Sequence, residues 1–313
     1  MSDGAPTVQR IAFVYDDIFL RHEMPLHHPE SSQRLQAIVA ELQSSGVGER
    51  LVRVLPAKSS LEAVAAVHSE RYVHQMVSMA PGYLDPDTYV SEGTCEAALY
   101  AAGAVGTAID GIVAGQWTRA FCAVRPPGHH AEKARGMGFC IFNNVAVGAR
   151  HAQACGYEKV LIADFDVHHG NGTQDIFYED PSVFYFSTHQ FPYYPGTGGE
   201  DERGSGEGLG FNLNVPLASG SGDEEISRAY AQAFASAAAR FQPDCVLVSA
   251  GYDLLAGDPL AGLAVTPAGL RSLVASIVSA AGDAPLIFTL EGGYDLHGLA
   301  SGVRQTVEIL LAD

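Results

Sequence analysis

The stretch DFDVHHGNG, residues 164–172, places acidic and imidazole side chains at every second position directly after the apolar run 160–163. If the backbone stays extended here, Asp164, Asp166 and His168 point to one face, because side chains alternate along a strand. Neighbouring carboxylates repel each other and lose solvation on burial, so a positive charge must lie beside them. A bound metal ion would supply that charge. The alternatives are an exposed acidic turn, or an Asp pair satisfied by helix N-termini and arginine.

A catalytic metal needs three protein ligands and an open position. Asp166 and His168 supply two of them, and Asp258 in the sequence LAGDP is the best candidate for the third, because that turn is expected at the same edge of the fold. An Asp2His set is richer in oxygen than the commonest zinc sites, so Fe(II) or another divalent ion is an alternative to the Zn²⁺ that we expect.

Two other motifs carry groups that suit hydrolysis. His129 and His130 follow the turn RPPG, and imidazole titrates in the range that a base toward an activated water requires. One of the two is expected to face the site and the other to support it. Tyr294 follows two glycines that allow close backbone approach, and its phenol is a neutral donor for an oxyanion. For each of these residues the alternative is a purely structural role.

The elements that must position these residues alternate along the whole chain. Strands are predicted at 10–14, 120–124, 159–165, 183–187, 211–215, 244–249 and 285–290. Helices are predicted at 31–45, 61–79, 94–114, 144–155, 224–240, 267–281 and 296–311, with Asn143 and Asn144 capping the fourth. This alternation predicts an α/β fold with a mostly parallel multi-stranded sheet and helices on both faces. Residues 1–313 are expected to form a single domain.

In such sheets ligands bind outside the carboxyl ends of the strands. Five predicted strands lead directly into RPPGHHA (125–131), DFDVHHGNG (164–172), STHQFPYYPGTG (187–198), SAGYDLLAGDP (249–259) and EGGYDL (291–296). All five motifs are therefore expected at one edge of the sheet. The glycine-rich segment 196–210 is predicted to be a loop, and it lacks the pattern of a phosphate-binding loop.

Composition narrows the range of partners. Asp and Glu number 36 against 18 Lys and Arg, a formal net charge of −18, which disfavours binding to nucleic acid or to an anionic membrane. The same charge favours a positively charged substrate, although it also serves solubility alone. The first ten residues lack a signal-peptide pattern, no uninterrupted apolar run approaches 18 residues, and the five cysteines form no CxxC pair. A cytoplasmic location is therefore expected.

Taken together, these motifs resemble the histone deacetylase family, in particular its class II branch and the bacterial histone deacetylase-like amidohydrolases. The resemblance runs in order from about His28 to the C-terminus, and it also includes GMGFCIFNN (136–144) and NVPL (214–217). It implies the arginase/deacetylase-like version of the fold. It also implies a zinc-dependent hydrolase that removes acetyl or other acyl groups from N-ε-acyl-lysine side chains of proteins or peptides.

The resemblance also implies individual roles. Zinc would be held by Asp166, His168 and Asp258. His130 would be the general base, supported by His129 and Asp164, and Tyr294 would donate to the acyl carbonyl oxygen. The substrate-binding positions would be Phe139 with its neighbour Gly138, Tyr194, Leu260, and Asp87 as the residue that grips substrate amides at the rim.

Structural potassium is a further implication. One site would be formed by Asp164, Asp166, His168, Ser187 and Thr188, and a second by Phe177, Asp180, Val183 and Phe211. A monovalent cation near the paired aspartates would offset their repulsion. Asn171 stands where class I enzymes carry an aspartate behind the general base, so His130 should be held less strongly in its cationic form. His169 is expected to be structural.

Three other functions stay open. An acetylpolyamine or other small acylated amine is an alternative substrate, although Leu260 stands where a polyamine-selective relative has a glutamate. A ureohydrolase with two manganese ions would need a carboxylate two positions after His168, where this chain has Gly170. A non-catalytic protein that binds acylated ligands is the third. A homo-oligomer is compatible with the sequence.

Overall fold

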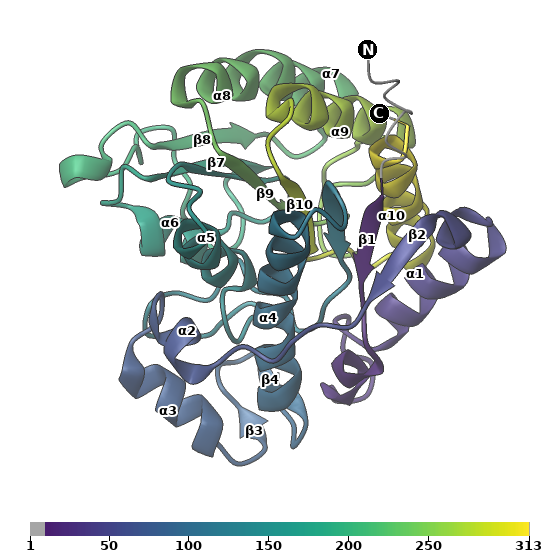
Figure 1. Ribbon diagram of the computed structural model, residues 1–313, viewed down its shortest axis with the longest axis vertical. Coiled ribbons are helices and arrows are strands. Elements are labelled where there is room, and N and C mark those ends of the chain that lie inside the picture. Colours follow the sequence, from purple (N-terminus) through teal and green to yellow (C-terminus); the bar gives the residue numbers. More distant parts are fainter. Residues whose placement is uncertain (1–9, 313) are drawn as a thin grey trace, which may run out of the picture.

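Eight parallel strands form the central sheet, in the order β2-β1-β5-β10-β9-β6-β7-β8, and a separate antiparallel pair is formed by β3 and β4 (Figure 1). The computed structural model describes residues 10–312. The strands are β1 Ile11–Val14, β2 Leu51–Val54, β3 Gly82–Tyr83, β4 Tyr89–Val90, β5 Arg119–Cys122, β6 Val160–Asp164, β7 Val183–Gln190, β8 Asn212–Leu217, β9 Cys245–Ala250 and β10 Leu286–Leu290. The predicted parallel α/β architecture is confirmed.

Helices cover both faces of this sheet. They are α1 Gln33–Ser44, α2 Leu61–Ala65, α3 Glu70–Ser78, α4 Thr94–Val113, α5 Asn144–Ala154, α6 Asn171–Phe177, α7 Asp223–Arg228, α8 Ala235–Phe241, α9 Pro267–Ala281 and α10 Leu296–Leu310. α4 and α5 pack on β5, β6 and β9, whereas Figure 1 shows α7, α8 and α9 on the other side of the sheet. β5, β6, β9 and β10 are buried along their whole length, as expected of strands covered on both faces.

Several elements differ from the sequence-based expectation, among them α6, β3 and β4, which were not predicted. The helix predicted at 61–79 is two helices, because Ser69 accepts the Tyr72 N–H and starts a new helix at Glu70. The helix predicted at 224–240 contains a π-helical segment, Ala229–Phe234, between α7 and α8. β2 was not predicted because, as an edge strand, it is only partly buried and its apolar pattern is weak.

The capping prediction is half right. The Asn143 side chain accepts the Ala146 N–H at 3.0 Å and caps α5. Asn144 instead donates to the Pro126 carbonyl at 3.1 Å, which ties the start of α5 to the loop after β5. This loop carries His129 and His130, so α5 helps to fix one wall of the candidate site.

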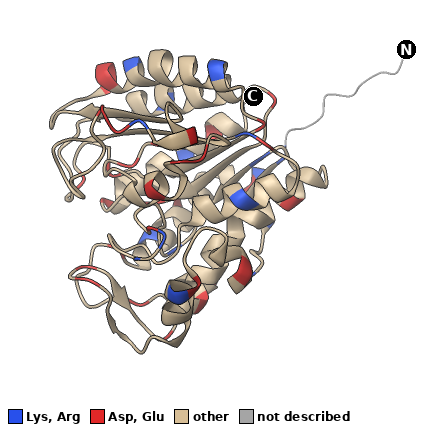
Figure 2. Cartoon of the chain, turned by 90° about the vertical axis from the view of Figure 1, so that its left-hand side faces the viewer, with Lys and Arg blue, Asp and Glu red and all other residues tan. Residues whose placement is uncertain are grey.

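Acidic side chains are spread over helices and loops in the view of Figure 2.

Within residues 10–312, α4 is long and apolar enough by length and composition to cross a membrane, but just over half of its most apolar stretch is buried inside the protein. A core helix of a soluble protein has the same properties, so this is weak evidence for a membrane span. The N-terminal residues used to argue against a signal peptide lie largely outside the described range.

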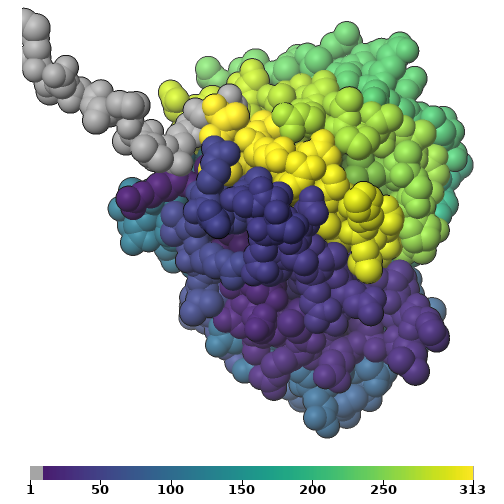
Figure 3. Space-filling model, turned by 90° about the vertical axis from the view of Figure 1, so that its right-hand side faces the viewer, coloured from purple at the N-terminus to yellow at the C-terminus, as the bar shows by residue number. Residues whose placement is uncertain are grey.

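A buried ion cluster joins segments that lie far apart in the sequence. Figure 3 shows the N-terminal part of the chain lying beside the C-terminal helix, and α1 packs on α10. Beneath them, the fully buried Glu30 carboxylate contacts Arg125, which begins the loop after β5, and Arg34, at 3.2 Å. Arg34 also donates to the carbonyls of Glu291 and Gly293 in the loop after β10. Glu30 therefore anchors two of the loops that build the site.

We predict that Glu30→Ala lowers the free energy of unfolding by about 3–5 kcal/mol, because the substitution leaves two buried guanidinium groups without their carboxylate. Urea denaturation followed by circular dichroism measures the effect. Glu41→Ala is the matched control: Glu41 pairs with Arg304 at 2.7 Å on the surface, and it should cost at most about 1 kcal/mol. Equal losses in the two variants would contradict the anchoring role of Glu30.

Candidate active site

The loops at the carboxyl edge of the sheet line a cavity of about 200 Å³. Its walls contain nine residues predicted from the sequence: Asp87, His129, His130, Gly138, Phe139, His168, Tyr194, Leu260 and Tyr294. The remaining lining residues are Pro127, Tyr193 and Gly292. The expectation that these motifs meet at one edge is confirmed, because all the strands that carry them are parallel.

The DFDVHH segment reaches this cavity by a different route from the one predicted. β6 ends at Asp164, so the backbone does not stay extended to His168. Instead, Asp164 Oδ1 accepts the Asp166 N–H at 3.1 Å, and Asp166 Oδ1 accepts the His168 N–H at 2.9 Å. Two successive side-chain-to-backbone turns of this kind hold the segment in place.

Asp166, His168 and Asp253 form a compact cluster whose ligand atoms all lie within 4.8 Å of one another. Asp253 follows β9 directly in the motif SAGYD, and its Oδ1 accepts the Val167 N–H at 3.0 Å. Asp258, the predicted third ligand, is not part of this cluster, and Asp253 stands in the position expected for it. Both aspartates lie in the same motif, but only Asp253 emerges from the end of the strand toward His168.

Asp258 has a different task. Its Oδ2 accepts the backbone N–H groups of Tyr294 and Asp295 at 2.7 and 3.1 Å, and its Oδ1 accepts the Leu260 N–H at 2.9 Å. These bonds fix the backbone on which Tyr294 stands, just before α10. Asp258 thus shapes the loop that carries Tyr294 and stays outside the cluster.

Two glycines make room for the cluster carboxylates. A Cβ atom on Gly251 would lie 2.0 Å from Asp166 Oδ2, and one on Gly292 would lie 2.1 Å from Asp253 Oδ2. Gly292 also donates its N–H to Asp166 Oδ2 at 2.8 Å. Any side chain at these positions would displace the carboxylates, so glycine here serves close approach.

Protein groups alone do not neutralise the carboxylates of this cluster. Burial, helped by the neighbouring Asp166 carboxylate, raises the pKa of Asp253 to about 6. Burial alone would lower the pKa of His168, but the Asp166 and Asp253 carboxylates raise it well above its usual value. Asp253 Oδ2 is buried, has no hydrogen-bond partner among the described residues, and lies 3.4 Å from His168 Nδ1. A buried carboxylate oxygen whose nearest charged neighbour is an imidazole nitrogen suits a cation bound by both.

His129 is held as a cation between two aspartates. Its Nδ1 lies 3.0 Å from Asp164 Oδ2, and its Nε2 lies 3.8 Å from Asp166 Oδ1. Burial would lower the pKa of His129, but these two carboxylates raise it to about 10. Asp164 is fixed in turn by the Tyr185 hydroxyl, which donates to Oδ2 at 3.0 Å. The predicted pairing of His129 with Asp164 is present.

His130, the next residue, has the opposite charge state. Its Nδ1 lies 2.8 Å from Asn171 Oδ1, while the Asn171 amide donates to Glu132 at 2.7 Å. The asparagine oxygen can only accept, so His130 Nδ1 carries the proton and Nε2 keeps a free lone pair. Burial, together with the charges of His129 and His168, lowers the pKa of His130 well below its usual value. His130 is therefore a neutral imidazole with one basic nitrogen.

Aromatic rings wall the cavity above these groups. The ring of Tyr194 lies 5.2 Å from that of His130, edge to face, and the ring of Tyr193 stacks on His168 at 5.7 Å. Phe139 lies 5.8 Å from the Tyr294 ring. Phe139 also adopts the left-handed backbone conformation, with φ of 68°, which non-glycine residues rarely do and which marks functional sites.

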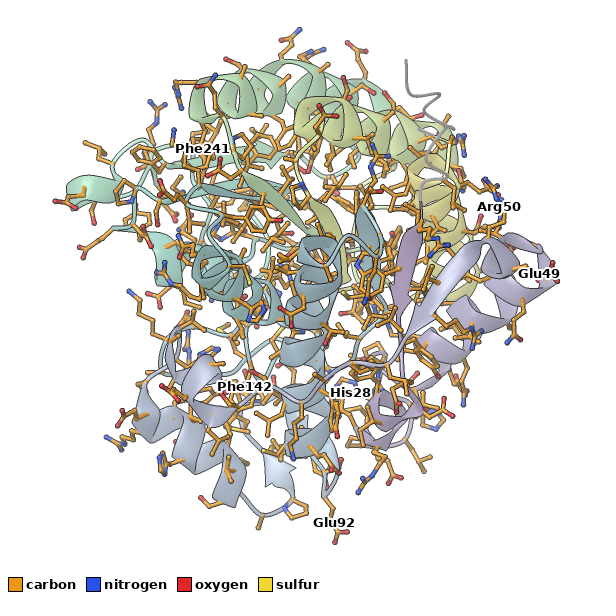
Figure 4. All side chains as sticks on the ribbon, viewed as in Figure 1. His28, Glu49, Arg50, Glu92, Phe142 and Phe241 are labelled. Carbon is orange, nitrogen blue, oxygen red and sulfur yellow. The ribbon has the colours of Figure 1, made fainter. Side chains whose placement is uncertain are left out.

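Asp87 is connected to Phe139 in this wall through hydrogen bonds of Thr88. The Phe139 N–H donates to Thr88 Oγ1 at 3.0 Å, and Thr88 Oγ1 donates to Asp87 Oδ1 at 3.0 Å. His28, labelled in Figure 4, contacts the Asp87 carbonyl at 3.1 Å and packs edge-on against Phe139 at 4.8 Å. A carboxylate is therefore fixed at the mouth of the cavity. Tyr193 closes another part of the mouth by donating to the Leu260 carbonyl at 3.0 Å.

Local contacts link some of the residues expected around potassium. Asp164 and Ser187 are register partners in β6 and β7, next to Thr188. In the second set, the Phe177 carbonyl accepts the Asp180 N–H at 3.0 Å and the Phe211 carbonyl accepts the Tyr185 N–H at 2.9 Å, beside Val183. His169 contacts Thr197 and Gln174 through its two ring nitrogens, consistent with the structural role expected for it.

Glu291 is a buried group to which the sequence analysis gave no role. Its Oε2 accepts the N–H groups of Gly128 and His129 at 2.7 and 3.1 Å, and its Oε1 accepts the Ser249 hydroxyl at 3.1 Å. Burial raises the pKa of Glu291 to about 7. The available signal was an acid directly after a fully buried, mostly apolar strand. Its carboxylate holds the backbone of the two histidines.

Comparisons with known proteins agree with this geometry. The family model for the histone deacetylase domain matches residues 28–310. Histone deacetylase 10, chloroplastic, of Oryza sativa subsp. japonica is 42% identical over 310 residues, covering 91% of this chain and 70% of that protein. A probable deacetylase of Archaeoglobus fulgidus is 39% identical over 292 residues, covering 91% and 81%. The crystal structure of the HDA15 HD domain has a TM-score of 0.93 at 38% identity, covering 97% and 90%.

The two aspartates of SAGYDLLAGDP can be distinguished by metal binding. We predict that Asp253→Ala weakens divalent metal binding by more than about 100-fold, the upper range for residues that only support a ligand, whereas Asp258→Ala stays within about tenfold of the unmodified protein. Competition with a chelator, followed by elemental analysis, measures both. The reverse order would restore Asp258 as the ligand.

Proposed function

The chain belongs to the histone deacetylase family and is a deacetylase that hydrolyses amide bonds, and we propose that it is zinc-dependent and acts on N-ε-acyl-lysine side chains of proteins or peptides. One observation carries this proposal: a buried Asp–His–Asp cluster, a neutral His130 and Tyr294 all converge on one cavity. Together these residues could hold a metal, accept a proton from water and donate to the developing oxyanion.

The cluster fits a zinc ion. Asp166, His168 and Asp253 offer two carboxylates and one imidazole, and Asp253 Oδ2 is a buried oxygen that accepts no hydrogen bond from the described residues and lies 3.4 Å from His168 Nδ1. Three protein ligands leave a position open, as catalytic zinc requires, and Fe(II) would accept the same set. When bound, zinc would polarise the acyl carbonyl and make a water acidic enough to attack at neutral pH.

His130 is the group that moves protons. Its free Nε2 accepts the proton of the attacking water, and the same nitrogen then returns it to the leaving lysine amine. Asn171 keeps Nδ1 protonated, so only Nε2 is available for this transfer. His129, held cationic by Asp164, places a fixed positive charge beside the reacting centre and has no need to exchange its own proton.

Tyr294 lines the same cavity as the two histidines, from the loop between β10 and α10. Burial raises the pKa of the Tyr294 phenol, so the phenol stays protonated and can donate to the carbonyl oxygen as negative charge develops there. The backbone bonds from Asp258 hold this residue in register.

The shape of the cavity favours an acylated lysine. Phe139 and Tyr194 present apolar ring surface that suits the aliphatic stem of lysine, and Asp87 at the mouth can accept backbone N–H groups of a bound peptide. Leu260 places no carboxylate at the mouth that would select a polyamine. The net charge of −18 favours a basic peptide. Potassium at the two sets of residues described above would further offset the buried aspartates.

We predict that the metal-loaded protein releases acetate from acetyl-lysine peptides in preference to acetylspermidine. His130→Ala should lose about 10²–10⁴-fold in kcat through loss of proton transfer. Tyr294→Phe should lose about 10²–10³-fold through loss of the oxyanion donor. Acetate release by coupled assay measures both, and His74→Ala, an exposed histidine on α3, is the matched control. Unchanged turnover in His130→Ala and Tyr294→Phe would contradict the mechanism. A preference for acetylspermidine would contradict only the substrate assignment.

Replacing the neutral partner of His130 should move the pH profile. In Asn171→Asp, a carboxylate beside Nδ1 favours the imidazolium form and raises the pKa of His130 by roughly one unit or more. Because only neutral His130 accepts a proton, activity would then be lost at a higher pH, and the acid limb of log kcat/KM would shift upward. Asn171→Ala is the control, which removes the hydrogen bond without adding charge. An unshifted acid limb in Asn171→Asp would show that His130 is not the base.

A further inference from the structure

A second group of metal-ligating side chains lies far from the cavity, at the C-terminal ends of α4 and α5, which run side by side (Figure 1). Asp110, His151 and Cys155, here called the α4–α5 cluster, place their ligand atoms within 4.8 Å of one another. His151 Nε2 lies 2.6 Å from Asp110 Oδ1, and Cys155 Sγ lies 4.0 Å from the same oxygen. Each helix ends just before a strand of the parallel sheet, so the cluster lies at the amino edge, opposite the active site.

We propose that the α4–α5 cluster is a second metal site, which takes a divalent transition cation of the zinc class. A thiolate and an imidazole are ligands that zinc, cobalt and nickel prefer, whereas magnesium and calcium prefer oxygen alone. The carboxylate completes three protein ligands, and solvent can fill a fourth position because Asp110 and Cys155 are exposed.

The frame that carries the ligands is rigid. His151 and Cys155 are four residues apart at the end of α5 and therefore share one face. At the helix crossing, a Cβ atom on Gly148 would lie 2.2 Å from the Val105 side chain, so the two backbones approach closely. A Cβ atom on Gly106, one turn before Asp110, would lie 3.5 Å from the His151 ring, so this ring packs close to the α4 backbone. Ligands on closely packed helices keep their positions better than ligands on loops.

The helix ends add a favourable field. α4 ends at Val113, three residues after Asp110, and α5 ends at Ala154, so the negative ends of both helix dipoles lie at the cluster. Tetrahedral coordination at bond lengths of about 2.0–2.3 Å needs ligand atoms roughly 3.3–3.6 Å apart. The present separations of 2.6 and 4.0 Å reach that range by small side-chain rotations.

The competing explanation is a simple ion pair between Asp110 and His151. That explanation gives Cys155 no role and predicts no metal binding. A metal of the zinc class binds cysteine as the thiolate, so binding at this cluster would use the Cys155 sulfur that the ion pair leaves without a role.

Cobalt distinguishes the two explanations, because a thiolate bound to Co²⁺ gives a charge-transfer band in the near ultraviolet. The catalytic cluster contains no cysteine, so the band would report only on the α4–α5 cluster. Untagged protein with its catalytic site already loaded with zinc is titrated with Co²⁺. We expect one additional equivalent per chain together with the band. Cys155→Ser should abolish the band, and His151→Ala and Asp110→Asn should each weaken cobalt binding at least tenfold.

Cys95→Ser is the matched control, since Cys95 is a half-buried thiol near the opposite end of α4, and the band should survive. Deacetylase activity checks that each variant is folded, because none of these residues contacts the cavity. The proposal fails if excess cobalt gives no band, if the band persists in Cys155→Ser, or if Cys95→Ser removes it equally. Failure of the catalytic assignment would leave this readout untouched.

Discussion

Repulsion among buried carboxylates is the constraint to which the other parts of the site respond. Asp164, Asp166, Asp253 and Glu291 are all almost completely buried at one edge of the sheet. Each carboxylate is stabilised by backbone N–H groups, and the imidazoles of His129 and His168 add positive charge. These donors do not neutralise the group, and a metal cation is the economical way to complete it.

The same constraint explains why the surrounding loops are held so firmly. A cluster of repelling groups keeps its geometry only if the backbone behind it cannot relax. The Glu30 carboxylate does part of this by contacting Arg125 at the start of one loop and Arg34, which holds the carbonyls of another. The loops of the site are therefore stabilised by a second set of buried charges, in which the Glu30 carboxylate is paired with Arg34 and Arg125.

Much of this was predictable from the sequence, and the failures have physical causes. Parallel strands with reactive residues at their ends were predicted because apolar runs and their boundaries are local signals. Asp253 was not predicted in the cluster because it lies five residues from Asp258 in one loop, and only the three-dimensional path of that loop decides which of the two faces His168. Glu291 received no role because its position directly after a strand was the only signal, and two of its partners are backbone N–H groups, which leave no mark in the sequence.

The pair His129 and His130 shows why a motif does not determine chemistry by itself. The two rings are adjacent, with centroids 4.0 Å apart, and both are buried. One faces the Asp164 carboxylate and is held cationic, while the other faces the Asn171 carbonyl oxygen and is held neutral. The cation beside it lowers the pKa of His130 further, after burial. The partner of each ring therefore decides its role. Asp164, at the end of β6, keeps His129 as a fixed positive charge, and Asn171, at the start of α6, keeps His130 as a neutral base.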